Sequence, residues 1–211
     1  MAITKETINA GVAQALEDKG KRKFQQSVDL AVNLQDADFK KPENRINLEI
    51  ILPHPANQLK VAVFADGQLA VEAKKYADLV ITSGELNAYA QDKKKQEQLA
   101  GLAVLAMPQL MAQVGKIFGQ FLAARGRLPK PILPNANLKD LVENTRRSVV
   151  LKSKGKMLPT LHCIVGKEAL PTDDITENII TVLDALKKKI SEHQISSICI
   201  KLTMGRSIRV R

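Results

Sequence analysis

The hydrophobic pattern of this chain changes twice, and this change constrains the fold more than any other feature of the sequence. Near the start, "SVDLAVNL" at 27–34 and "RINLEIIL" at 45–52 alternate apolar and polar residues. Alternation with a period of two is typical of an antiparallel sheet with one wet face. The middle instead contains short apolar runs, "KVAVFA", "DLVIT" and "LAVLAM", separated by helical stretches. These runs predict a parallel sheet with helices on both faces.

The last third returns to the first pattern. "SVVLKSKGK", "MLPTLHCIVG" and "SSICIKL" are predicted strands, with a long helix expected from Asp173 to about His193. The other helices are expected over residues 4–19, with Thr4 as N-cap and Gly20 as the stop, and near 68–76, 85–98, 108–122 and 138–147, the last capped by Asn137.

These patterns predict an α/β protein of two domains. Residues 1–57 and 147–211 together form a split α+β domain, and residues 58–146 form an inserted Rossmann-like domain of three α/β/α layers. The chain then crosses between the domains twice.

The charge distribution indicates a polyanionic partner. The net charge is +10, and the basic excess rises from 0 in residues 1–57 to +4 in 58–146 and +6 in 147–211. Two cysteines form no disulfide framework, which favours a reducing cytosol. The N-terminus lacks a signal-peptide pattern and no apolar run has membrane-spanning length, so no membrane partner is expected.

Catalytic chemistry leaves little trace in the sequence. No phosphate-binding glycine loop follows a strand, and His54, His162 and His193 have no metal-ligand spacing to the cysteines. In "HC" at 162–163, alternation places one residue in the core, and a buried cysteine beside a surface histidine is the simpler interpretation. We therefore expect no catalytic residue, metal site or cofactor.

The first binding motif is "KRKFQQS" at 21–27. Phe24 lies among three cations just before an alternating strand. It is either a core aromatic that starts the sheet or a platform for a base or ribose, with Lys23 on a phosphate.

The second motif, "TMGR" at 203–206, interrupts the alternation of "CIKLTMGRSIRV". A glycine turn explains Gly205 but not an apolar Met204 between Thr203 and Arg206. Glycine permits close approach of a partner, a threonine hydroxyl can pair with a ribose 2′-OH, and methionine offers adaptable contact.

These motifs resemble the L-one family of large-subunit ribosomal proteins, in its archaeal branch. The resemblance covers essentially the whole chain and rests on "KRKFQQSVDL", "NRINLEIILPHP", the loop "RGRLPKPILPN", taken as a hinge loop, and above all "TMGRSIRV". That loop departs from the methionine-rich bacterial version.

The resemblance implies a split RNA-binding domain with a Rossmann-like domain inserted, in a cytoplasmic, ribosome-associated protein that is a monomer when free. It implies binding to the stalk region of large-subunit ribosomal RNA, assistance in release of deacylated transfer RNA at the exit site, and repression of translation through the protein's own messenger RNA.

Carried over residue by residue, the family's RNA-contact motif falls on Lys23, Phe24, Ser27, Ser197, Thr203, Met204 and Gly205, with a weaker local match at Lys154 and Gly155. Lys201 and Arg206 are added on charge and strand phase, since Lys201 shares the outward phase of Ser197 and Thr203.

Two other classes of function stay open at this stage. A general basic RNA chaperone would bind with steep salt dependence and little discrimination between RNAs. A nucleotide-dependent enzyme built on the Rossmann-like part is disfavoured because the phosphate loop is absent, and a fold alone does not establish activity.

Overall fold

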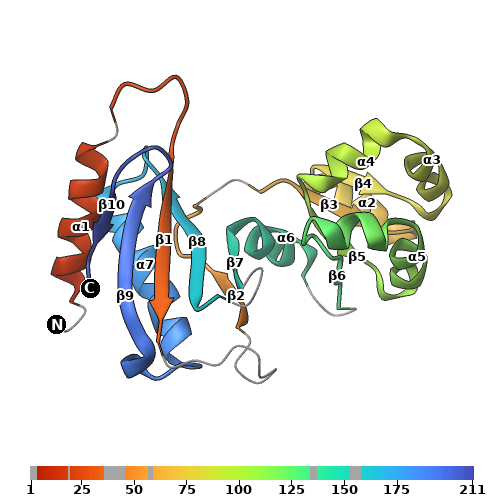
Figure 1. The fold of residues 1–211 in the computed structure, drawn as a ribbon. Helices are drawn as coiled ribbons and strands as arrows, with labels where there is room; N and C mark the ends of the chain where they lie inside the picture. The colour runs from red at the N-terminus through yellow and green to blue at the C-terminus, as the bar shows by residue number, and fades with distance from the viewer. Residues whose placement is uncertain (1–3, 19, 36–45, 57–58, 134–136, 153–157) are drawn as a thin grey trace. The chain divides into compact units, whose positions relative to one another are not determined.

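A computed structural model describes residues 4–18, 20–35, 46–56, 59–133, 137–152 and 158–211. The chain divides into two compact units, one of residues 1–57 with 147–211 and the other of residues 58–146 (Figure 1). The mixed α/β class is confirmed, with one parallel sheet and two antiparallel sheets among the described residues. That each unit is an independent domain stays a proposal.

The first unit is built on a four-stranded antiparallel sheet in the order β10-β9-β1-β8. Its strands are β1 (Ser27–Leu34), β8 (Thr160–Lys167), β9 (Ile195–Leu202) and β10 (Ser207–Arg209). A two-stranded antiparallel sheet pairs β2 (Asn47–Ile51) with β7 (Ser148–Lys152). Strand β1 pairs with both β8 and β9, so the two ends of the chain share one sheet.

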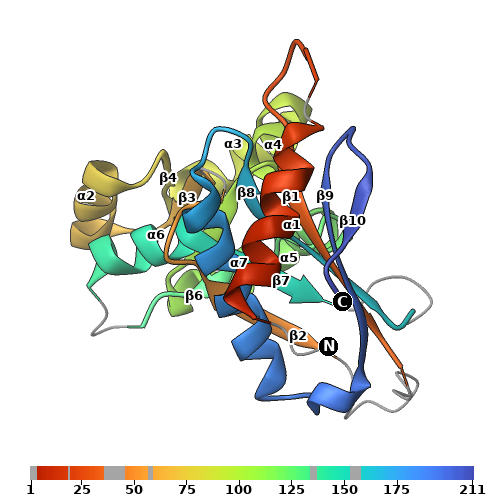
Figure 2. The same ribbon diagram turned by 90° about the vertical axis from the view of Figure 1, so that its left-hand side faces the viewer.

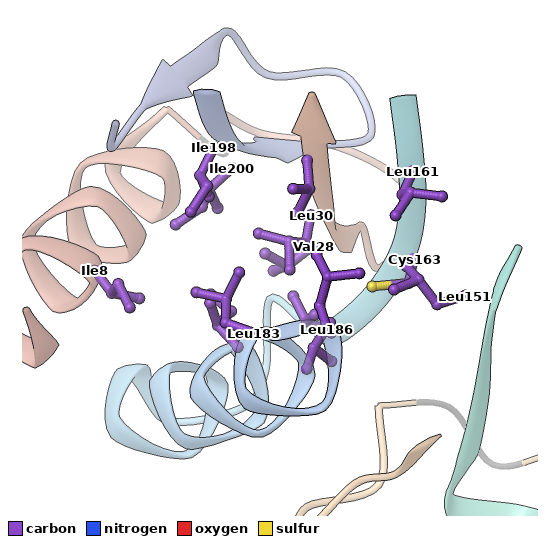
Figure 3. Close-up of a cluster of buried hydrophobic side chains, with 14 of the residues drawn as sticks. Ile8, Val28, Leu30, Leu151, Leu161, Cys163, Leu183, Leu186, Ile198 and Ile200 are labelled. Carbon is purple, nitrogen blue, oxygen red and sulfur yellow. The ribbon is translucent and has the colours of Figure 1, made fainter. Parts of the chain in front are cut away.

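Two helices cover one face of this sheet, α1 (Lys5–Glu17) and α7 (Thr172–Lys187), and they lie side by side in Figure 2. Their apolar stripes meet the inward positions of the strands, and the resulting core appears in Figure 3, where Ile8 of α1 and Leu183 of α7 face Leu30 and Ile200. All four side chains are at most 2% exposed. The opposite positions on the strands are left for solvent or a partner.

The helix ends follow the local sequence signals. The Thr4 hydroxyl accepts the N–H of Thr7 at 3.4 Å and so caps α1. Gly20 has a φ of +57°, which suits a residue just beyond the end of a helix. Helix α7 ends at Lys187, earlier than His193, because the Ser191 N–H turns to Gln194 Oε1 at 3.3 Å and a short 3₁₀ turn, η3 (Glu192–Gln194), follows.

The second unit is a parallel sheet in the order β4-β3-β5-β6. Its elements are β3 (Val61–Phe64), α2 (Gly67–Tyr76), β4 (Leu79–Ile81), η2 (Ser83–Glu85), α3 (Leu86–Gln91), α4 (Lys93–Ala100), β5 (Ala103–Ala106), α5 (Pro108–Ala124), β6 (Lys130–Pro131) and α6 (Leu138–Arg147). One apolar cluster joins α3, α4 and α5 to the sheet, and another joins α2 and α6 to its other face, as the continuous apolar strands predict.

Two expectations for this unit are wrong. The loop "RGRLPKPILPN" is not a hinge, because its described part, residues 125–133, leads from α5 into the edge strand β6 within residues 58–146 and does not include either crossing. The single helix expected over 85–98 is instead η2, α3 and α4, because Asp92 stops one helix and caps the next, its carboxylate accepting the Lys94 N–H at 3.0 Å.

Candidate nucleic-acid interface

The start of β1 and the end of β9 are joined by hydrogen bonds at one corner of the first unit. The Thr203 N–H donates to the Ser27 carbonyl at 3.1 Å, and the Ser27 N–H donates to the Thr203 hydroxyl at 3.2 Å. The same hydroxyl lies 3.3 Å from the Ser27 carbonyl. Figures 1 and 2 place the loop 20–26 and the β9–β10 turn at the same end of the sheet. The structure therefore brings the two sequence motifs together.

The exposed side chains of this corner are flat, apolar or cationic. Phe24 is 51% exposed and Met204 is 58% exposed, whereas most large apolar side chains in this unit are buried. Lys23 and Arg206 are also exposed. Exposure of Phe24 contradicts the alternative that it is a core aromatic. Apolar platforms flanked by cations suit a base or ribose with adjacent phosphates.

The Thr203 hydroxyl is already used in hydrogen bonds within the protein, which limits what it can offer to a partner. A hydroxyl has one proton and two acceptor lone pairs. With the Ser27 N–H on one lone pair and the proton directed at the Ser27 carbonyl, one lone pair is left for a partner. Thr203 is thus best suited to accept from a ribose hydroxyl while also holding β1 against β9.

Gly205 is required by space and not by backbone conformation. Within the described ranges, the glycines with positive φ are Gly20, Gly67 and Gly126. At Gly205 an added Cβ would lie 3.0 Å from the Leu202 Cβ and 3.6 Å from Asp18 Oδ2. A side chain here would require Leu202 to shift by a few tenths of an ångström, so glycine suits the close approach of the turn to Leu202 and Asp18.

The outer face of the sheet continues from this corner. Lys201 is exposed and lies opposite Asp29 across the β9–β1 ladder. Burial raises the pKa of Asp29 above its usual 3.8, opposed by the charges of His162 and Lys201. The face therefore has one partly buried acid beside its cations.

Ser197 lies farther along the same face and is 9% exposed. Its hydroxyl accepts a hydrogen bond from Asn33 Nδ2 at 2.8 Å. Ser197 lies six positions before Thr203 in extended chain, a distance of about 20 Å. A contact at Ser197 thus stays a prediction, and it would need a partner that runs along the sheet. Lys154 and Gly155 lie outside the described residues.

Two residues that hold the turn were missed by the sequence analysis. The Met204 N–H donates to Gln26 Oε1 at 3.0 Å, and the Arg206 N–H donates to Asp18 Oδ2 at 2.8 Å. Gln26, the second glutamine of "QQS", is a polar residue that is nevertheless buried, with an exposed fraction of 1%. The signal that could have found Gln26 is its phase, because it continues the inward alternation of Val28 and Leu30, whereas Gln25 shares the outward phase of Ser27.

Among the described residues, no three His, Cys, Asp or Glu side chains are arranged to hold a metal ion. His162 is exposed and Cys163 is buried, as alternation predicts, and burial raises the pKa of the Cys163 thiol to about 12. No helix in the described ranges is long and apolar enough to cross a membrane.

The His54 ring approaches Asp174 Oδ2 at 3.6 Å and Glu177 Oε2 at 3.0 Å. The hydrogen bond from His54 lowers the pKa of Glu177. Since His54 N–H and C=O also pair with the buried Asn178 side chain, this group fixes the segment after β2 to α7 and is structural.

Comparison with known proteins gives a consistent result. Residues 14–206 match the model of the "Ribosomal protein L1p/L10e family". The chain is 38% identical to the large ribosomal subunit protein uL1 of Hyperthermus butylicus, over 99% of this chain and 98% of the relative. It is 44% identical to the protein of that name from Thermofilum pendens, over 90% of this chain and 86% of the relative. The Archaeoglobus fulgidus protein is 35% identical over the full length of both.

Proposed function

This chain belongs to the ribosomal protein L1p/L10e family, and from that premise we propose that the corner formed by loop 20–27 and turn 203–206 binds the stalk region of large-subunit ribosomal RNA. As a member of this family the protein is a structural, non-enzymatic component of the large ribosomal subunit, in the cytoplasm. Binding to ribosomal RNA follows from that membership. The location of the site and the identity of the RNA region are the proposal.

The observation that carries the proposal is the set of hydrogen bonds between Ser27 and Thr203. They join two motifs 176 positions apart into one surface that displays Phe24, Met204 and cations. Such a surface offers stacking and 2′-OH contacts, with few groups for reading base edges in a groove. A folded RNA recognised by its shape is the partner that fits.

Two further roles belong to the proposal. The protein assists release of deacylated transfer RNA as the stalk moves, and it represses translation by binding a stalk-like site in its own messenger RNA. The second role needs no additional surface, because one corner would bind either RNA. A messenger transcript that competes with the ribosomal transcript for one site, and is weakened by the same variants, would support it.

The test is titration calorimetry of the whole protein with a transcript of the stalk region across a salt series. Lys23→Gln should weaken binding and reduce the slope of log affinity against log salt by about one unit, because one phosphate contact is lost. Phe24→Ala should weaken binding by about 1–3 kcal/mol without changing the slope, because stacking is lost.

Lys75, an exposed lysine of the second unit, supplies the matched control, since Lys75→Gln removes the same charge from the unit that does not contain the corner. Binding that survives a large excess of transfer RNA supports a specific stalk contact. Binding that the competitor abolishes, or equal effects of Lys23→Gln and Lys75→Gln, would favour a general RNA chaperone instead.

A further inference from the structure

The β9–β10 turn, residues 203–206, has each of its four backbone N–H groups paired within the protein. The acceptors are the Ser27 carbonyl, Gln26 Oε1, the Leu202 carbonyl and Asp18 Oδ2. We infer that Asp18 and Gln26 are positioning residues of the RNA-binding corner, which fix the turn in the shape that the RNA contacts. This inference rests on the proposed function.

Asp18 is an unexpected residue at a cationic corner. It is exposed, and Lys21, Arg22 and Lys23 follow it closely in the chain. An exposed carboxylate here repels phosphates, so its charge alone disfavours RNA. Its hydrogen bond with the Arg206 N–H, at 2.8 Å, supplies a compensating role.

The position of Asp18 explains how this hydrogen bond can act. Asp18 is the C-terminal cap of α1, and the stripe of α1 that includes Ile8, Val12 and Ala15 is at most 2% exposed. The carboxylate therefore projects from a helix that is fixed to the core. It ties the far end of the turn to that helix, while Thr203 ties the near end to β1.

Gln26 acts from below the turn. Its side chain is buried and accepts the Met204 N–H at 3.0 Å, and its carbonyl accepts the Glu168 N–H at 3.0 Å. Gln26 thus links the exposed methionine to the segment after β8. With α1, β1 and β8 all attached, the turn has little freedom to lose when RNA binds, which favours affinity.

The same pairing determines which hydrogen-bonding groups the turn can offer to a partner. With its N–H groups used internally, the turn has no backbone donor for a phosphate and cannot act as an anion-binding nest. The RNA groups that match a surface of acceptors and apolar carbon are donors, the ribose 2′-OH and base amino groups. Phosphates are left to the lysine and arginine side chains.

A pair of variants at Asp18 separates positioning from charge. Asp18→Asn removes the charge but keeps an oxygen acceptor, whereas Asp18→Ala removes both. With the stalk-region transcript as probe, Asp18→Asn should bind at least as tightly as wild type. Asp18→Ala should bind about 3- to 10-fold more weakly than Asp18→Asn, the effect of one net hydrogen bond, with the same salt slope.

A double-mutant cycle gives a readout that a merely structural role would not change. Met204→Ala should weaken binding less in the Asp18→Ala background than in the wild type, because a loosened turn no longer positions the methionine. Gln26→Met, which keeps side-chain length but replaces the amide oxygen with a weakly accepting sulfur, should show the same non-additivity. Thermal melts check that each variant folds. If Gln26→Met does not fold, the two Asp18 variants still test the positioning role.

The outcomes separate this inference from the proposed function. If wild type binds and Lys23→Gln weakens it, but Asp18→Ala matches Asp18→Asn or adds fully to Met204→Ala, the positioning role is overturned while the site stands. If wild type does not bind the transcript, the proposed function fails first.

Discussion

Thr203 shows how one side chain can hold the fold and serve the partner. Its hydroxyl pairs with both backbone groups of Ser27, so its removal affects the corner even before RNA arrives. The sequence motif predicts an exposed hydroxyl for RNA, and the structure adds that β1 and β9 depend on it too. Thr203 therefore stabilises the pairing of β1 with β9 and, in the proposed function, also contacts the RNA.

We predict that Thr203→Val weakens binding to the stalk-region transcript roughly tenfold to hundredfold, about 1–3 kcal/mol, because the Ser27 N–H and an RNA hydroxyl both lose an acceptor. The salt slope should stay unchanged, since no phosphate contact is lost. Thr203→Ser keeps the hydroxyl and is the control. Calorimetry with thermal melts measures both, and wild-type affinity in Thr203→Val would show that the turn is only structural.

Asp29 allows a pH prediction. Its pKa is raised mainly by burial, so the folded state holds this proton more tightly than the unfolded state does. Stability must then fall as the pH rises from 3.8 through the folded pKa, and the penalty is complete at neutral pH.

Asp29→Asn should therefore melt at the same or a higher temperature than wild type at pH 7, and the difference should vanish below the unfolded pKa of 3.8. Melting curves across pH, without RNA, test this. A clear loss of stability in Asp29→Asn at pH 7 would mean that the attraction of Lys201 and His162 outweighs burial, contrary to the direction of the pKa shift.

At the scale of elements, the period of the hydrophobic pattern was a good guide to strands and a poorer guide to helix ends. The strand at 27–34 matches β1 residue for residue, because alternation is a direct consequence of pleating. Helix ends depend on single capping side chains. Asp92 divides the helix expected at 85–98, because an aspartate can accept N–H groups of the turn that follows it.

Asp92 also precedes three lysines, Lys93, Lys94 and Lys95, in the first turn of α4. Cations there oppose the helix dipole, so the cap has to compensate. Asp92→Ala should destabilise α4 by about 1 kcal/mol, whereas Asp92→Ser should retain most of the cap. Hydrogen exchange at the Lys94 and Gln96 amides measures the effect locally. Unchanged protection in Asp92→Ala would show that packing alone maintains this helix.

At the scale of the whole molecule, each unit holds its own chain ends together. In the first unit, the Leu52 N–H donates to the Arg147 carbonyl at 3.2 Å, next to the β2–β7 ladder. In the second unit, the Asp78 carboxylate accepts from the Val61 N–H at 2.9 Å and from Arg146 at 3.0 Å. These contacts lie next to the points where the chain passes from one unit to the other. Within each unit, they hold the entering and leaving segments together without help from the other unit.

We predict that residues 1–57 joined to 147–211 by a short flexible linker fold and bind the stalk-region transcript within about tenfold of the whole protein, about 1.4 kcal/mol. Both parts of the corner lie in these residues. Excised residues 58–146 are the control and should fold without binding it. A first unit that folds but loses several powers of ten in affinity would show that the inserted unit carries RNA contacts.

The local sequence was sufficient for properties that depend on near neighbours along the chain. Alternation identified the strands, and Thr4 and Asn137 marked helix starts. The two changes of pattern led to the proposal that residues 58–146 form an inserted domain. The motifs "KRKF" and "TMGR" drew attention to Phe24 and Met204 but left open whether Phe24 is a core aromatic, and the structure shows both side chains exposed.

Only the tertiary structure decided which polar groups meet. Alternation places Gln26 in the inward phase of Val28, but the pairing of its side chain with the Met204 N–H arises only because β1 lies beside β9 in the folded sheet. Asp18 reaches Arg206 across 188 positions, and Ser197 is paired with Asn33 across 164. Hydrogen bonds of this kind act over about 3 Å, and which atoms come within that range is set by the packing of the whole sheet and its helices.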